Sequence, residues 1–100
     1  MLWAITRVSV PNKEKERETY VQSHRDYLKS QHKILVLGGA RLSDDGETQL
    51  GSLLIVNVAS RGAAQAFLDA DPLMKCGVFT VSDIARIRKG HFNPGAADRA

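Results

Sequence analysis

Six short segments of regular hydrophobic pattern follow one another along the chain, and their order restricts the fold more than any other feature. They cover residues 2–10, 12–31, 33–42, 50–58, 61–70 and 77–88. The first, third, fourth and sixth are rich in β-branched and apolar residues, which favours strands. The second and fifth carry apolar residues three and four positions apart, as amphipathic helices do. This order predicts an α+β fold of the ferredoxin-like βαββαβ type, with an antiparallel four-stranded sheet and both helices on one face.

Local signals mark where these elements begin and end. Asn12 is placed to cap the first helix and Ser60 to cap the second, because short polar side chains accept hydrogen bonds from the first helical amides. Asp71 precedes a proline, which disfavours helical geometry and ends the second helix. The Asp-Gly pair at 45–46 predicts a hairpin turn. We expect one domain over residues 1–100, with a core at 1–89 and a loose tail at 90–100.

The fourth segment is apolar in both phases of a strand. Leu53 and Ile55 lie on one side, and Leu54, Val56 and Val58 lie on the other. An antiparallel sheet with one wet face should instead alternate apolar with polar residues. A buried central strand could tolerate such a pattern, but a second copy packed sheet against sheet explains it better. The sequence therefore predicts a homodimer in the manner of the dimeric α+β barrels.

Size and composition exclude several classes of function. The triplet His24-Arg25-Asp26 resembles a kinase catalytic loop, but 100 residues are too few and Gln31 replaces the required Asn. The net charge of +3 is scattered, which argues against a nucleic-acid partner. No apolar run reaches the roughly 20 residues that span a bilayer, and the first ten residues lack the features of a signal peptide. The single cysteine, Cys76, fits a reducing compartment, so we expect a cytoplasmic protein without a membrane partner.

His24 lies in the apolar stripe of the first predicted helix, together with Tyr20 and Tyr27 among others. A histidine in such a position is more often a neutral core residue than a catalytic one, and an aspartate before proline, such as Asp71, often only closes a helix. The predicted architecture connects the two residues, because both helices lie on the same face of the sheet. A carboxylate within reach of an imidazole fixes its tautomer and raises its basicity, which makes a general base.

Further residues are candidates for binding a ligand. Arg7, Tyr27 and Ser82 are candidate substrate-binding groups, although surface placement is the default for an arginine on a strand. The glycines at 38, 39 and 77 would leave room for a small molecule near the sheet. Cys76 has no neighbour in sequence that would favour its thiolate. The histidines at 24, 32 and 91 lack the spacing of metal ligands, so we expect neither a metal nor a cofactor.

The order and spacing of several short motifs resemble the YCII-related (YciI-like) family over roughly residues 1–90. These motifs are His24 followed by Tyr27-Leu28, the stretch LGGARL at 37–42, Gly51, Asp71-Pro72, and Cys76-Gly77-Val78-Phe79. The resemblance implies ferredoxin-like subunits that form dimeric α+β barrels, and an active-site pair that maps to His24 and Asp71. It also implies removal of hydrogen chloride from a chlorinated hydroxyhydroquinone, and a relation to isomerases that transfer protons. The sequence departs from the family pattern after the last strand, at KGHFNP.

The resulting hypothesis is a small cofactor-free enzyme, a lyase or an isomerase-type enzyme. It would use the His24–Asp71 pair for general acid–base chemistry on an oxygenated or chlorinated aromatic-derived small molecule. The alternative is a non-catalytic module of the same fold that binds or senses a small ligand. A nucleic-acid binder ranks last, since no aromatic side chain lies on the middle strands.

Overall fold

The computed structural model describes the whole chain, Met1 to Ala100. Its elements are β1 (Leu2–Ser9), α1 (Glu14–Ser30), β2 (Leu35–Leu42), β3 (Gln49–Asn57), α2 (Arg61–Asp69), α3 (Pro72–Lys75), β4 (Phe79–Ile87) and a 3₁₀ helix (Pro94–Arg99). The four strands form one antiparallel sheet in the order β2-β3-β1-β4. The predicted ferredoxin-like βαββαβ fold is therefore confirmed.

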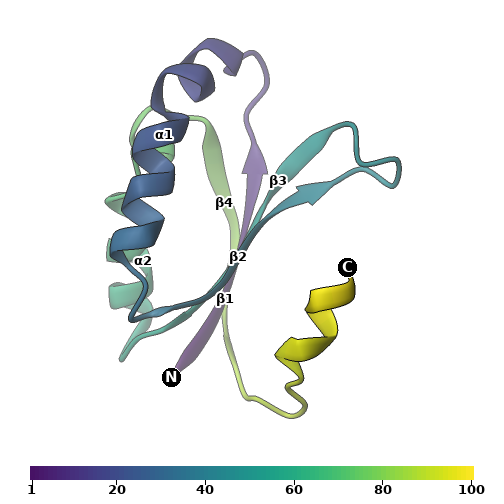
Figure 1. Cartoon of the computed structure of the whole chain (residues 1–100). Coiled ribbons are helices and arrows are strands. Elements are labelled where there is room, and N and C mark those ends of the chain that lie inside the picture. Colours follow the sequence, from purple (N-terminus) through teal and green to yellow (C-terminus); the bar gives the residue numbers. More distant parts are fainter.

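The helices α1 and α2 cover one face of this sheet, and the C-terminal segment turns to the opposite side (Figure 1). The core lies between helices and sheet, where Ile5, Leu54 and Val56 pack against Phe67 and Leu68 of α2. All five side chains are almost fully buried. Burial of each such side chain contributes about 1.5–3 kcal/mol. These contacts fix the sheet against α2 and so determine which strand residues face the helices.

Strand β1 shows how the pairing register places polar groups on the helix side. Its residues alternate, so Ile5 and Arg7 point toward the helices in the same phase. In the antiparallel pairing with β3, Ile5 lies opposite Leu54 and Arg7 lies opposite Ser52. The apolar pair therefore anchors the core, while the next pair along the same face brings an arginine and a serine together in a buried position.

The ends of the helices differ in part from the sequence-based expectations. Ser60 caps α2 as expected, since its hydroxyl accepts a hydrogen bond from the amide of Ala63. The prediction for Asn12 is wrong, because this residue adopts a left-handed conformation with φ of 62° and the cap position of α1 falls on Lys13. The short helix α3 was not expected; Asp71 caps its first turn by accepting from the Leu73 amide.

Two other segments also depart from prediction. The last strand begins at Phe79 rather than at Gly77, which has a positive φ of 81° and ends the turn after α3. The C-terminal tail is not wholly irregular, since Pro94–Arg99 form a helical turn. Tyr20, assigned to the inward stripe of the first helix, is exposed.

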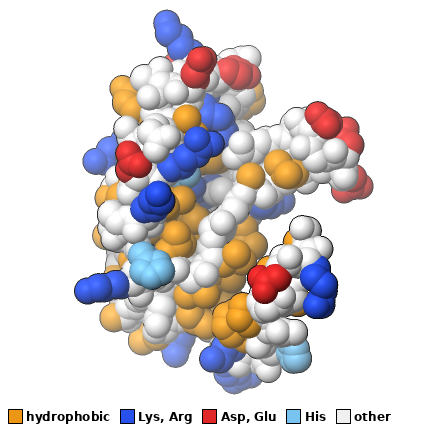
Figure 2. Space-filling view, viewed as in Figure 1, with side chains coloured by type: hydrophobic (Ala, Val, Ile, Leu, Met, Phe, Trp, Pro, Cys, Tyr) orange, Lys and Arg blue, Asp and Glu red, His pale blue; other side chains and the backbone are white.

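The sheet face turned away from the helices exposes apolar side chains. Leu37 of β2 and Leu53 of β3 are large, exposed apolar residues on this face. Figure 2 shows hydrophobic side chains gathered in the hollow between the body of the molecule and its C-terminal segment. A cleft there is bordered by Ile55, Ile87 and Phe92, among others. None of the helices combines the length and the apolar composition that crossing a membrane requires.

Candidate functional site

A cavity of about 240 Å³ lies on the helix side of the sheet. Its walls come from α1, from β1, β2 and β3, and from the segment that carries α3 and the start of β4. Gly38 and Gly39 of β2 line it, and they expose no side chain there. Backbone atoms and small residues thus leave space beside the sheet edge, while the side chains that carry chemistry come from the strands and helices around it.

His24 and Asp71 meet at this cavity. The Nδ1 atom of His24 lies 2.8 Å from Oδ1 of Asp71, across 47 positions of sequence. The histidine comes from the inward face of α1 and borders the cavity, with 15% of its side chain exposed, whereas the aspartate is only 1% exposed. The aspartate reaches the imidazole because it begins α3, the short helix that packs against α1.

Arg7 completes the polar cluster beneath the cavity. Its Nη1 donates to Oδ2 of Asp71 at 2.8 Å, and its Nε donates to the hydroxyl of Ser52 at 2.7 Å. The guanidinium lies over the ring of Phe79, with its central carbon 4.1 Å from the ring centroid. This stacking adds a cation–π attraction. The arginine is almost fully buried, contrary to the default of surface placement.

The cluster holds Asp71 in its charged form. Burial alone would raise the pKa of Asp71, but the hydrogen bonds from His24, Arg7 and a backbone amide outweigh it and lower the pKa below its ordinary value. Burial also lowers the pKa of Arg7, and its bond with the aspartate opposes that shift. An arginine stays protonated in proteins. A charged carboxylate can only accept, so the Nδ1–H of His24 is the donor and Nε2 of the neutral ring is unprotonated.

Two nitrogen atoms of the cluster remain without a partner in the chain. Nδ1 of His24 is bonded and Nε2 is not; in Arg7, Nε and Nη1 are bonded and Nη2 is not. Every fully buried side-chain nitrogen or oxygen in the protein has a hydrogen-bond partner. These two atoms therefore keep some accessible surface, and both residues line the cavity, so a ligand there would meet one basic nitrogen and one cationic donor.

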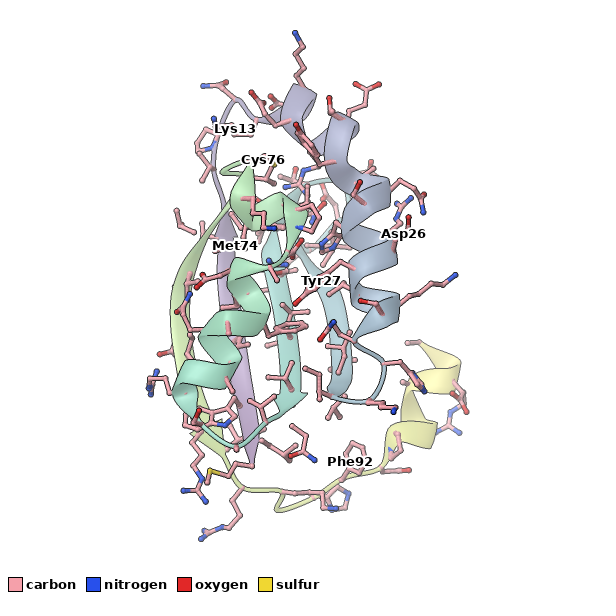
Figure 3. All side chains as sticks on the ribbon, turned by 90° about the vertical axis from the view of Figure 1, so that its left-hand side faces the viewer. Lys13, Asp26, Tyr27, Met74, Cys76 and Phe92 are labelled. Carbon is pink, nitrogen blue, oxygen red and sulfur yellow. The ribbon has the colours of Figure 1, made fainter.

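The other proposed ligand-binding residues lie elsewhere. The hydroxyl of Tyr27 donates to the carbonyl oxygen of Phe67 at 2.6 Å. Figure 3 shows Tyr27 between α1 and the segment of α2 and α3. Ser82 is exposed on β4 at the point where the pairing with β1 shifts register, because Thr6 pairs with Asp83 and the next residue pairs with Val81. Neither Tyr27 nor Ser82 borders the cavity.

The triplet at 24–26 points in different directions, as helical spacing requires. Asp26 lies on the outer side of α1 (Figure 3) and accepts a hydrogen bond from Gln22. Helical spacing predicts that Arg25, the next residue after His24, also turns away from the inward face, and this prediction needs correction. Arg25 is exposed, but it borders the cavity. The arginine side chain is long, so from the edge of the inward face of α1 it can still reach the cavity.

Ser52 and Phe79 were not singled out as site residues from the sequence. Both are buried, and both contact Arg7. For Ser52 a signal existed, since it shares the phase of Leu54 on a strand whose inner face is otherwise apolar. Gly51 also matters here. A Cβ at this position would lie 1.9 Å from the carbonyl oxygen of Arg7, so only glycine allows β1 and β3 to approach beside the cluster.

The potential metal ligands are dispersed. No group of three or more histidine, cysteine, aspartate or glutamate side chains is arranged to hold a metal ion. Asp71, the carboxylate nearest the cavity, is engaged by His24, by Arg7 and by the Leu73 amide. The polar side chains that line the cavity itself are therefore imidazole, guanidinium, hydroxyl and the carboxamide of Gln49.

The βαββαβ fold with its four-stranded antiparallel sheet is that of a ferredoxin-like subunit of the dimeric α+β barrel class. The chain belongs to the YCII-related domain family, whose profile matches residues 1–88. Members of this family are typically dimeric. The resemblance inferred from the order of the motifs is thereby confirmed, and the departure after the last strand coincides with the end of the matched region.

A solved structure of an enzyme is similar to this chain. It is the 5-chloro-2-hydroxyhydroquinone dehydrochlorinase of Burkholderia phenoliruptrix AC1100, in complex with 2,5-dihydroxybenzoquinone. The two chains share 28% sequence identity with a TM-score of 0.78, and the match covers 90% of this chain and 96% of the enzyme. A search of curated proteins gives no match.

Proposed function

We propose that the protein is a cofactor-free enzyme that uses His24 and Asp71 for proton transfer on an oxygenated or chlorinated ring compound. The observation that carries the proposal is the 2.8 Å contact between His24 Nδ1 and the buried carboxylate, which leaves Nε2 free at the cavity. The similarity to a dehydrochlorinase supports the finer reaction, elimination of hydrogen chloride from a chlorinated hydroxyhydroquinone.

The elimination needs one base and a route for the electron pair. In the keto tautomer of such a substrate, the ring carbon that carries chlorine is saturated. His24 Nε2 takes the proton of a ring hydroxyl, and the O–H electron pair becomes a carbonyl bond. A ring double bond then shifts, and the C–Cl bond breaks with its pair leaving on chloride. The products are a quinone, chloride and a proton on His24.

Asp71 and Arg7 have separate roles in this scheme. The carboxylate holds the tautomer in which Nε2 is basic, and it stabilises the imidazolium that forms when the proton arrives. Arg7 fixes the carboxylate from the other side and offers Nη2 to a substrate oxygen. Tyr27 stays a candidate only for a role through packing, since its hydroxyl is already engaged.

The test is chloride release from chlorinated hydroxyhydroquinones by the purified protein, under reducing, oxygen-free conditions. His24→Ala should lower turnover by about 10²–10⁴-fold, the range that a positioned base contributes. His32→Ala is the matched control, because this histidine is exposed and lies outside the cavity. Full activity in His24→Ala would refute the role of the histidine. Saturable binding of the quinol without any chloride release would support the alternative of a ligand-binding module.

We also propose that the protein works as a homodimer, joined through the sheet face that the helices leave open. Leu37 and Leu53 are large apolar residues on that face, and each is more than one-third exposed in the single chain. Contiguous exposed apolar surface marks an interaction site. Sedimentation of the wild type should give twice the mass of the chain, and Leu53→Asp should give a monomer. A monomeric wild type at micromolar concentration would exclude this assembly.

A further inference from the structure

The charges around the cavity are strongly unbalanced. The titratable side chains that line it are Arg7, His24 and Arg25, and no carboxylate is among them. Asp71 lies behind the wall, where its charge is matched by that of Arg7. The only ion pairs in the whole chain are those of Asp71 with Arg7 and with His24, so Arg25 has no acidic partner.

A third arginine strengthens the positive field. Arg17 of α1 lies over the same Phe79 ring as Arg7, with its guanidinium carbon 5.0 Å from the ring centroid. Its side chain bonds to the hydroxyl of Ser9 rather than to a carboxylate. The proximity of Arg17 contributes to the lowered pKa of Arg7, as expected for two like charges. Two of the three arginines near the cavity are therefore uncompensated.

The cavity is also small. Its volume is about 240 Å³. A cavity of about 150 Å³ is enough to hold benzene in a protein core. One six-membered ring with a few substituents therefore fits inside the cavity. Val21, Leu28 and Leu54 supply apolar wall against which such a ring can pack.

We propose that the cavity binds the anion of a small ring compound, whose charged oxygen binds Nη2 of Arg7 while Arg25 attracts it at the mouth. This inference rests on the proposed function for the site and adds the charge of the substrate. The Nη2 atom has no hydrogen-bond partner, although it belongs to a side chain that is only 1% exposed, so the fold holds an unused donor in place for a ligand. For a hydroxylated ring, the bound form would be the one that has already lost one acidic hydroxyl proton.

Binding of matched probes tests the inference without any turnover. Benzoate and benzamide have nearly the same shape and differ in charge. Calorimetry or NMR titration should give benzoate an affinity about 10–100-fold higher than benzamide, the effect of one hydrogen bond to a charged group. Equal affinities for benzoate and benzamide, or no binding of benzoate, would overturn the proposal.

Two exposed positions on α1 separate a local contact from bulk charge. Arg25→Gln should weaken benzoate binding by about two- to fivefold, the effect of an exposed charge, and leave benzamide unchanged. Lys29→Gln removes the same charge one turn further along α1, at a residue that does not border this cavity, and should change neither affinity. Equal losses in both variants would refute the role of Arg25. Both substitutions are at exposed residues, so the fold is preserved.

The binding experiments test the anion site separately from the proposed reaction. If the protein releases chloride from a chlorinated quinol but binds benzoate and benzamide alike, the charge selection is wrong and the reaction stands. If benzoate is preferred and no chloride is released, the anion site stands and the proposed reaction is wrong.

Discussion

Replacing Asp71 with asparagine should invert the tautomer of His24. The carboxylate accepts three hydrogen bonds: from His24 and the Leu73 amide at Oδ1, and from Arg7 at Oδ2. An asparagine offers one oxygen and one NH₂ group in the same place. Because the buried Arg7 requires an acceptor, the amide oxygen turns toward it and the NH₂ faces the histidine. Nδ1 must then accept, so the ring proton moves to Nε2, where a base is needed.

The cost to stability follows from the same contacts. The substitution leaves the buried guanidinium without a counter-ion and the Leu73 amide without an acceptor. Breaking a buried ion pair from one side costs about 3–5 kcal/mol. In a domain of this size that loss lowers Tm by roughly 15–30 °C. Turnover should fall by about 10²–10⁴-fold, because the ring keeps its place but presents a proton in place of a lone pair.

Nitrogen-15 NMR of the histidine ring reads the tautomer directly, and thermal unfolding at fixed protein concentration reads the stability. We expect the Nδ1–H form in the wild type and the Nε2–H form in Asp71→Asn. Asp69→Asn is the control, since Asp69 is an exposed carboxylate two positions away that bonds only to Gln65. It should stay within about 0.5 kcal/mol of the wild type. An Nδ1–H tautomer in the Asp71 variant, or an unchanged Tm, would refute the account of the cluster.

Three other predictions follow from the site and its surroundings. Because the pKa of Asp71 is lowered in the folded protein, its charged carboxylate stabilises the fold fully above the unfolded-state pKa of about 4. This stabilisation is lost as the pH falls through the lower folded-state pKa. Urea unfolding of the wild type should therefore show a loss of stability in acid that Asp71→Asn lacks. Gly51→Ala should cost up to about 3 kcal/mol and weaken ligand binding, because the new methyl group would press on the Arg7 carbonyl; an unchanged Tm would contradict the close approach. Tyr27→Phe should cost about 1 kcal/mol through the bond to the Phe67 carbonyl and leave ligand affinity unchanged, and a large loss of affinity would instead place the hydroxyl in the site.

Much of the fold could be predicted because its signals are local. The alternation of Trp3, Ile5 and Arg7 along β1 is a property of strand geometry. The capping of α2 by Ser60 depends on a short polar side chain at the start of the helix. The incorrect predictions also concern short segments of the chain. Asn12 has the right residue type for a cap, but it is used in the left-handed turn that leads into α1. The four residues of α3 are too few to produce a periodic pattern.

The site could be predicted only in part. Helical spacing identified His24 as inward-facing, and the Asp-Pro pair identified Asp71 as the end of a helix. The partnership of Asp71 with Arg7 had no such signal. An arginine on a strand is most often exposed. Arg7 is buried because its guanidinium contacts three partners: the Asp71 carboxylate, the Ser52 hydroxyl and the face of the Phe79 ring. Those partners come from three separate parts of the chain.

The sequence by itself determined which face of each helix and strand turns inward, although not for every residue at its edge, since the periods of helix and strand are set by the backbone and act over a few residues. These periodic patterns predicted the order of the elements and the inward placement of His24. They also showed that strand β3 is apolar on both of its faces. Only the tertiary structure decided which inward-facing groups meet. The antiparallel register sets Arg7 beside Ser52, and α3 carries Asp71 to the histidine. Distances between elements depend on packing and on the register of the sheet, which involve residues far apart along the chain.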